Sequence, residues 1–166
     1  MLGLFVTPTV VAIGDALTSI LRPAAGAASS AEPESIAVVG NARIAAALGA
    51  TRVVIPVGLS PRAARKLRGA ARELSALEPA SLAALVGVDL AVAAGWQDTL
   101  RDWSRAVRDG GAIVFVDRGH AHEASRRALC AGLTEIEQRR AGRAVITSGV
   151  VSHFGPEDLG APPAGS

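Results

Sequence analysis

The sequence predicts a single α/β domain in which helices cover both faces of a mostly parallel β-sheet. Its 166 residues, 49% hydrophobic and 19% charged, fit one domain with a substantial core. From residue 36 onward, short apolar runs alternate with helical segments, which is typical of parallel strands joined by crossovers. The last two strand-like runs, Leu133 to Arg139 and Ala144 to Val151, are joined across Arg140-Ala-Gly142 with no helix between them. They predict an antiparallel hairpin at the end of a three-layer αβα domain.

Residues 1–22 form the first predicted element, an amphipathic helix. Val10, Ile13 and Leu17 recur at helical spacing, and Asp15 lies away from them. The segment lacks the basic start of a signal peptide and is interrupted too often for a membrane span, so no membrane span is expected. We expect the helix to pack on the edge of the domain or to meet a protein partner or a second copy of the chain.

The domain proper is predicted over residues 36–151, as five strand–helix units followed by the hairpin. The expected strands are Ile36 to Val39, Val53 to Val57, Ser75 to Leu77, Val88 to Ala93 and Ala112 to Val116. The expected helices are Ile44 to Leu48, Arg62 to Leu74, Ser81 to Val86, Trp96 to Arg108 and His120 to Ala131. Residues 152–166 are rich in Pro and Gly without an apolar pattern, and predict a flexible tail.

Two segments extend this pattern to a known family. Gly58-Leu-Ser-Pro61 follows a strand, and Val107-Arg-Asp-Gly-Gly-Ala-Ile-Val-Phe-Val-Asp117 runs from a helix through a Gly-Gly turn into a strand. Together with the order of all elements, they resemble the core of class I S-adenosylmethionine-dependent methyltransferases over roughly residues 8–151. The resemblance implies a Rossmann-like methyltransferase fold and a cofactor site at the carboxyl ends of the strands.

That resemblance assigns a degenerate cofactor site. The implied cofactor-binding residues are Gly40, Asn41, Ala42, Gly58, Glu78, Gly95 and Trp96. Ala42 replaces the second glycine of the family's turn, and Val38 and Gly58 stand where the family has acids, the second of which binds the ribose. Loss of that charge-assisted contact with the ribose weakens the binding free energy of the cofactor by about 1.5–3 kcal/mol. We therefore expect no cofactor, or S-adenosylmethionine if the protein is active.

Glu78 and Trp96 have two interpretations each. Glu78 could lie near the adenine or be a surface carboxylate that caps a helix. Trp96 could stack on a planar ligand or serve packing. The family's nitrogen-methylating members carry Asn or Asp, two prolines and an aromatic residue after the fourth strand, where this chain reads Ala93-Ala-Gly-Trp96. Methylation of an amide or adenine nitrogen is therefore not expected.

Three other features carry weaker hypotheses. Asp117, His120, His122 and Glu123 could hold a metal or supply a base, but their spacing is no recognised ligand set, and no metal is expected. The basic residues from Arg62 to Arg72 lack interleaved aromatic residues and predict a solvated surface, so a nucleic-acid partner is not expected. The lone Cys130 cannot form an internal disulfide, which favours the cytoplasm.

The function predicted from the sequence is a methyltransferase-like domain that has lost cofactor binding and acts as a protein-binding or scaffolding module. Two alternatives stay open. One is an active methyltransferase of a small molecule or a protein, and the other is an arginine-rich nucleic-acid-binding module. The acid that binds the ribose is missing at Gly58, and the methyl group of Ala42 narrows the turn. We therefore expect that no open cofactor pocket remains at the carboxyl edge of the sheet and that this edge is filled in by side chains.

Overall fold

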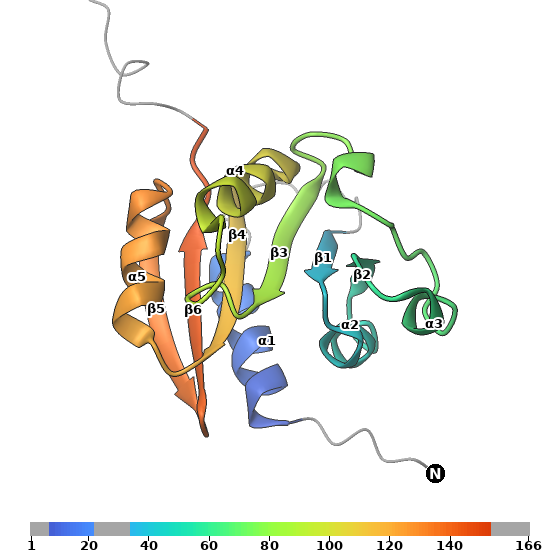
Figure 1. Ribbon diagram of the computed structural model, residues 1–166, viewed down its shortest axis with the longest axis horizontal. Helices are drawn as coiled ribbons and strands as arrows, with labels where there is room; N and C mark the ends of the chain where they lie inside the picture. Colours follow the sequence, from blue (N-terminus) through green and yellow to red (C-terminus); the bar gives the residue numbers. More distant parts are fainter. Residues whose placement is uncertain (1–6, 22–33, 154–166) are drawn as a thin grey trace, which may run out of the picture.

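The computed structural model describes residues 7–21 and 34–153, which form a six-stranded sheet between two layers of helices (Figure 1). The strand order is β2-β1-β3-β4-β6-β5. The first four strands in that order are parallel, and β6 runs antiparallel to both β4 and β5. The strands are β1 (Ser35–Val39), β2 (Val53–Val57), β3 (Leu82–Val88), β4 (Val107–Arg118), β5 (Thr134–Ala141) and β6 (Ala144–Val150).

Alternating side chains of the inner strands build two cores, one on each face of the sheet. On one face, Ile36, Val114 and Ile146 pack under α1 (Pro8–Ile20) and α2 (Ala42–Leu48). On the other face, Leu85 and Phe115 pack under α4 (Trp96–Ala106) and α5 (Ala121–Cys130). The predicted αβα architecture with a closing antiparallel hairpin is therefore confirmed.

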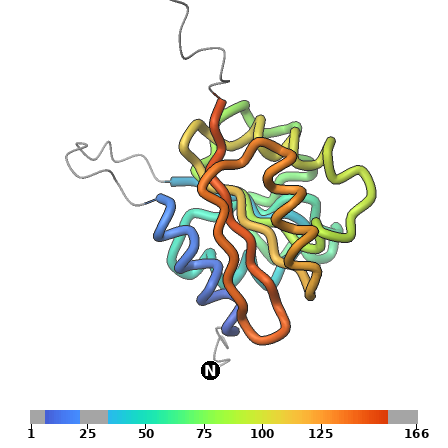
Figure 2. The backbone as a smooth tube through the Cα atoms, turned by 90° about the vertical axis from the view of Figure 1, so that its left-hand side faces the viewer, coloured from blue at the N-terminus to red at the C-terminus, as the bar shows by residue number. Residues whose placement is uncertain are grey.

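Helix α1 lies along the sheet beside the hairpin strands, as Figures 1 and 2 both show. Thr7 caps its first turn, and Pro8 occupies the first helical position, where a missing N–H costs nothing. Ile13, Ala16 and Leu17 are its buried residues. Its apolar stripe is thus covered by the chain's own sheet. No helix in the described ranges is long and apolar enough to cross a membrane.

The predicted helix from Arg62 to Leu74 is wrong beyond its first turn, because α3 spans only Pro61–Ala64. The chain then turns back, and Ala71 forms an isolated parallel bridge with Val57 at the outer edge of β2. The Ala71 N–H donates to the Pro56 carbonyl at 2.8 Å, and the Ala71 carbonyl accepts from the Gly58 N–H at 3.2 Å. The predicted third strand at Ser75 to Leu77 is wrong as well, since a 3-10 helix, η1, occupies Leu74–Ala76.

The next two predicted elements are also wrong, and for one shared reason. The predicted helix from Ser81 to Val86 is strand β3, and the predicted strand from Val88 to Ala93 is the turn that follows it. Every β3 residue except the last is buried, so both faces of the strand are apolar and the sequence shows no alternation. Alanine and leucine then favour a helix locally, and pairing with β1 and β4 overrides that preference.

Helix α4 is fixed on its face of the sheet by Trp103, which is buried. Its ring lies directly over Gly87 of β3, where even a Cβ atom would overlap the ring carbons. The glycine therefore allows a large aromatic side chain to approach the strand backbone. This contact sets the distance between α4 and the sheet.

Candidate functional site

Gly40, Asn41 and Ala42 form the turn from β1 into α2, at the carboxyl edge of the sheet. Gly40 has a φ of +70°, and its N–H donates to the Val57 carbonyl at 2.9 Å. The Asn41 side chain accepts from the Ile44 N–H at 2.9 Å and so caps α2. Ala42 is the first residue of the helix. The structure therefore brings this turn next to the end of β2, as expected.

Gly58 directly follows β2 and has a φ of +66°. No atom lies within 4 Å of the position that a Cβ would take on Gly40 or on Gly58. The expectation that this edge has filled in is therefore wrong at these two glycines. A side chain at position 58 would have room, although its backbone conformation favours glycine.

A cavity of about 580 Å³ lies at the same edge, between α1 and α2. Val88, Val116 and Ile44 contribute apolar walls, and the polar groups belong to Asn41, Asp89, Arg118, Arg43 and two threonines of the α1 start. Gly58, Glu78 and Trp96 are not among its lining residues. The sequence does not reveal Asp89 and Arg118 as site residues. Asp89 falls inside the predicted strand Val88 to Ala93, although β3 ends at Val88, and Arg118 lies two residues beyond the predicted end of β4 at Val116.

Glu78 lies at the opposite end of the sheet from Gly40 and Gly58, so its assignment to the cofactor site is wrong. It precedes β3, and its carbonyl accepts from the Ser81 hydroxyl at 2.7 Å. Two residues on, the Ala80 N–H donates to the Arg105 carbonyl near the end of α4. The error follows from the third strand, which the sequence analysis placed before Glu78 instead of after it.

Gly95 and Trp96 lie on the α4–α5 face of the sheet, away from the α1–α2 face that holds Asn41. Gly95 caps α4 with a φ of +67°, and Trp96 is the first helical residue. The Trp96 ring centroid lies 5.8 Å from the Arg126 guanidinium carbon and 5.2 Å from that of Arg127. These contacts favour a packing role for Trp96.

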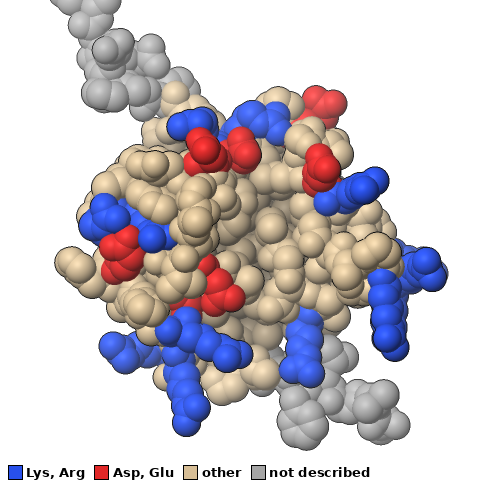
Figure 3. All heavy atoms as spheres, viewed as in Figure 1, with Lys and Arg blue, Asp and Glu red and all other residues tan. Residues whose placement is uncertain are grey.

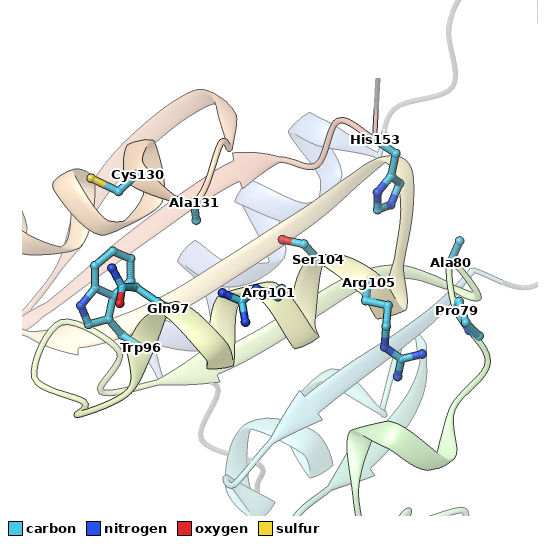
Figure 4. A pocket seen from close by; sticks show the side chains of 10 residues that line it. All are labelled: Pro79, Ala80, Trp96, Gln97, Arg101, Ser104, Arg105, Cys130, Ala131 and His153. Carbon is cyan, nitrogen blue, oxygen red and sulfur yellow. The ribbon is translucent and has the colours of Figure 1, made fainter. Parts of the chain in front are cut away.

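Trp96 borders the α4–α5 groove, a cavity of about 830 Å³ between these two helices (Figure 4). Figure 4 shows Trp96 and Arg101 on α4, with Cys130 at the end of α5 across from them. His153 lies at the far end, where its ring Nε2 is 2.8 Å from the Val107 carbonyl. Leu129, beside Cys130 in sequence, is 66% exposed.

Asp117 anchors the loop that follows β3. Its side chain is buried, and Oδ1 accepts from the Ala91 N–H at 2.8 Å. The other oxygen, Oδ2, is buried without a hydrogen-bond partner. Burial raises the pKa of the Asp117 carboxyl, while the Ala91 hydrogen bond lowers that pKa and the charge of Asp89 raises it further.

Arg127 holds the same loop from the side of α5. Its Nη1 donates to the Leu90 carbonyl at 2.6 Å and to the Ala93 carbonyl at 2.9 Å. Its Nε donates to Glu123 at 2.8 Å. Hydrogen bonds from Arg126 and then Arg127 lower the pKa of Glu123 to about 2. Spacings of three and four residues along a helix could have revealed these pairs in the sequence.

The Glu123 carboxylate thus forms its ion pairs with Arg126 and Arg127, which argues against a role as a metal ligand. His120 caps α5, with a φ of +56°, and His122 lies within the first helical turn. No group of three or more His, Cys, Asp or Glu side chains that could hold a metal occurs in residues 7–21 and 34–153.

Positive charge is concentrated in the part of the chain that includes β1, α2, β2 and α3. Residues 35–72 contain no Asp or Glu and seven basic residues: Arg43, Arg52, Arg62, Arg65, Lys66, Arg68 and Arg72. Three of these, Arg43, Arg62 and Lys66, line a cavity of about 390 Å³ between α2 and α3. The chain as a whole has a net charge of only +2, so the remainder is acidic.

Comparison with known proteins identifies the fold. Neither a protein-family model nor a curated protein matches the chain. Among solved structures, a complex between a Haloferax volcanii methyltransferase activator and a methyltransferase matches with a TM-score of 0.63 and 13% identity, over 89% of this chain and 94% of that one. An S-adenosylmethionine-dependent methyltransferase from Thermotoga maritima matches with a TM-score of 0.59 and 15% identity, over 89% and 92%.

A third match is the Thermus thermophilus 16S rRNA methyltransferase, in complex with S-adenosylmethionine and guanosine. Its TM-score is 0.54 at 19% identity, over 82% of this chain but only 39% of that chain. This chain likewise spans 48% of a citrinin polyketide synthase methyltransferase domain. The protein therefore has the class I S-adenosylmethionine-dependent methyltransferase-like fold that the sequence resemblance implied.

Proposed function

We propose that this domain is a non-catalytic, methyltransferase-like binding module in which the affinity for S-adenosylmethionine is weak or lost. The observation that carries the proposal is the absence of any carboxylate from residues 35–72, which include the end of β2 at Gly58. S-adenosylmethionine carries a sulfonium and an ammonium group against one carboxylate, so it is a net cation. A segment with seven basic residues and no acid offers a cationic ligand no electrostatic attraction.

The loop after β3 supports the same proposal. It reads Asp89-Leu-Ala-Val-Ala-Ala-Gly95, and its carbonyls at Leu90 and Ala93 are bonded to Arg127. The motif of the family's nitrogen-methylating members, Asn or Asp followed by two prolines and an aromatic residue, is missing. We therefore assign no catalytic residue in this loop.

A protein partner is the second part of the proposal. One structural neighbour is a methyltransferase in complex with an activator protein, which suggests partnering for this chain also. The apolar stripe of α1 is covered by the sheet, with Ile13 and Leu17 fully buried, so it is not available to a partner. The α4–α5 groove is the surface that we propose for the contact, and Leu129, next in sequence to the groove residue Cys130, is exposed.

One observation favours an active methyltransferase as the competing function. The cavity of about 580 Å³ at the carboxyl edge lies within the range of small-molecule sites, roughly 300–1,000 Å³. Asp89 and Arg118 could meet the ammonium and carboxylate groups of an amino-acid moiety there. This alternative predicts cofactor binding without any engineered acid.

Calorimetric titration with S-adenosylmethionine and S-adenosylhomocysteine decides between the two. We expect no binding in the low micromolar range for the unaltered chain. Gly58→Asp combined with Ala42→Gly should raise the affinity by about tenfold to a hundredfold, which corresponds to the 1.5–3 kcal/mol of a restored charge-assisted contact.

The matched control is Gly58→Asn in the same Ala42→Gly background. Asn has the shape of Asp and tolerates the same positive φ, but it lacks the charge. A low micromolar dissociation constant for the unaltered chain would overturn the proposal. Equal gains with Asp and Asn would show that charge at position 58 is not the missing element.

A further inference from the structure

The basic side chains of residues 35–72 are not neutralised by the rest of the protein. Within the ranges that the structure describes, every ion pair involves residues outside this segment. Arg52 donates to the Thr18 hydroxyl at 2.7 Å, and the other six basic side chains make no hydrogen bond or ion pair there. Keeping so many like charges together without partners costs free energy, which a bound anion would recover.

These charges come from several elements that surround one hollow. Arg43 lies on α2, Arg62 on α3, and Lys66 on the turn after α3, and all three line the cavity of about 390 Å³ between the helices. Arg65 and Arg68 continue the array along the same turn. We call this surface the α2–α3 face, and in Figure 3 Lys and Arg side chains stand out on the α3 side of the molecule.

The hollow itself is apolar. Besides the three basic residues, its walls consist of Ala42, Ala46, Ala63 and Leu67, with Ser60 as the remaining polar residue. Cations around small apolar walls fit a ligand with negative charge outside and a flat, weakly polar part inside. A nucleotide has that chemistry, because its phosphate meets the cations and its base meets the alanines.

We propose that the α2–α3 face binds the phosphate groups of a single-stranded nucleic acid, with one unpaired nucleoside in the hollow. Six of the seven basic residues are arginines, whose forked guanidinium groups match phosphate oxygens in pairs. Arg65, Arg68 and Arg72 are not among the residues that line the hollow, so they are available to further phosphates, which favours a strand over a mononucleotide. A duplex base cannot enter the hollow, which favours an unpaired strand.

This inference departs from the sequence-based expectation of a merely solvated helix face, and the reason is structural. Helix α3 ends at Ala64, so Arg62 and Lys66 do not lie on one face of a long helix but line the hollow together with Arg43 of α2. The lack of aromatic residues remains informative. Without stacking platforms, binding depends on the phosphates, so it should vary little with sequence and strongly with salt.

Fluorescence anisotropy with a labelled 12-nucleotide uridylate strand tests the proposal. We expect binding at 50 mM salt, weakening as salt increases, for the full chain. The combined variant Arg43→Gln, Arg62→Gln and Lys66→Gln should lose about a hundredfold in affinity. The slope of log affinity against log salt should become shallower by about 2, at roughly 0.7 per lost single-strand phosphate contact.

The matched control removes the same net charge elsewhere, as Arg108→Gln, Arg140→Gln and Arg143→Gln, all at exposed positions outside the described cavities. The affinity of this control for the strand should fall by less than about fivefold, because only the long-range electrostatic field of the protein changes. Melting temperatures of both variants should stay near that of the unaltered chain.

Five outcomes would overturn the proposal. The first two are failure of the unaltered chain to bind the strand at 50 mM salt, and an equal loss of affinity in both triple variants. The third is competition by polyglutamate as strong as by the strand, which would point to an acidic protein instead. If uridine monophosphate binds as tightly as the 12-mer, the ligand is a mononucleotide and not a strand. If a duplex binds more tightly than the single strand, the requirement for an unpaired base is refuted.

Discussion

Replacing Leu17 with alanine tests whether α1 belongs to the core of the domain. Leu17 is fully buried and packs with Ile36, Val38 and other residues on one face of the sheet. A Leu→Ala change in a core costs about 2–5 kcal/mol, which combines lost burial with the cavity left behind. We expect about 3 kcal/mol, near the middle of that range.

That loss is large against the roughly 5–15 kcal/mol that stabilise a typical domain. For a chain of this length, each kcal/mol lowers the melting temperature by about 2–4 °C, so the variant should melt about 6–12 °C below the unaltered protein. Urea unfolding followed by circular dichroism measures the free energy, and a thermal scan measures the melting temperature.

Val11→Ala is the matched control, since Val11 lies on the same helix and is 50% exposed. It should change the free energy of unfolding by less than about 0.5 kcal/mol. Equal effects of the two substitutions would refute the packing of α1 on the sheet. Loss of solubility in the Leu17 variant alone would still agree with it, because the uncovered face is apolar.

Three further substitutions have defined outcomes. Gly87→Ala should cost about 3 kcal/mol in urea unfolding, because its Cβ overlaps the buried ring of Trp103; a neutral effect would contradict that packing. Burial raises the pKa of Asp117 above 3.8, so the unfolded state releases this proton first and stability falls as pH rises from about 4 through the raised pKa. Asp117→Asn should therefore gain stability relative to the unaltered protein over that interval, and parallel pH profiles would exclude a raised pKa. Arg127→Gln should increase amide hydrogen exchange at Ala91 and its neighbours in the loop after β3, and unchanged protection would show that the loop does not need this side chain.

The order of elements could be predicted from the sequence at both ends of the chain but not in its middle. β4 and the hairpin are marked by long β-type runs and by the turn at Gly142, so local chemistry and tertiary pairing agree there. Between residues 62 and 93, alanine-rich segments satisfy helix and strand patterns alike. Only the neighbouring strands decide, and their contacts are not visible in a local pattern.

The site residues could be predicted only where the strand that precedes them was predicted correctly. Gly40, Asn41 and Gly58 follow strands that were located correctly, so their place at the carboxyl edge could be predicted. Glu78 is misplaced because the third strand is predicted before it, at Ser75 to Leu77, whereas β3 follows it. Asp89 is missed because it falls inside the predicted strand Val88 to Ala93, which is a turn in the structure. An error in one strand thus displaces every site residue that is counted from it.

The outer edge of β2 has a consequence for how the protein behaves at high concentration. Near the end of β2, the outward-facing backbone groups belong to Pro56 and Gly58. Pro56 has no N–H, and its carbonyl accepts from the Ala71 N–H. The Gly58 N–H donates to the Ala71 carbonyl. By alternation, Val54 is the residue within β2 whose N–H and carbonyl both point outward. An incoming strand from another molecule would therefore find too few partners to extend the sheet. Self-association by edge-to-edge strand pairing is accordingly disfavoured at this side of the domain.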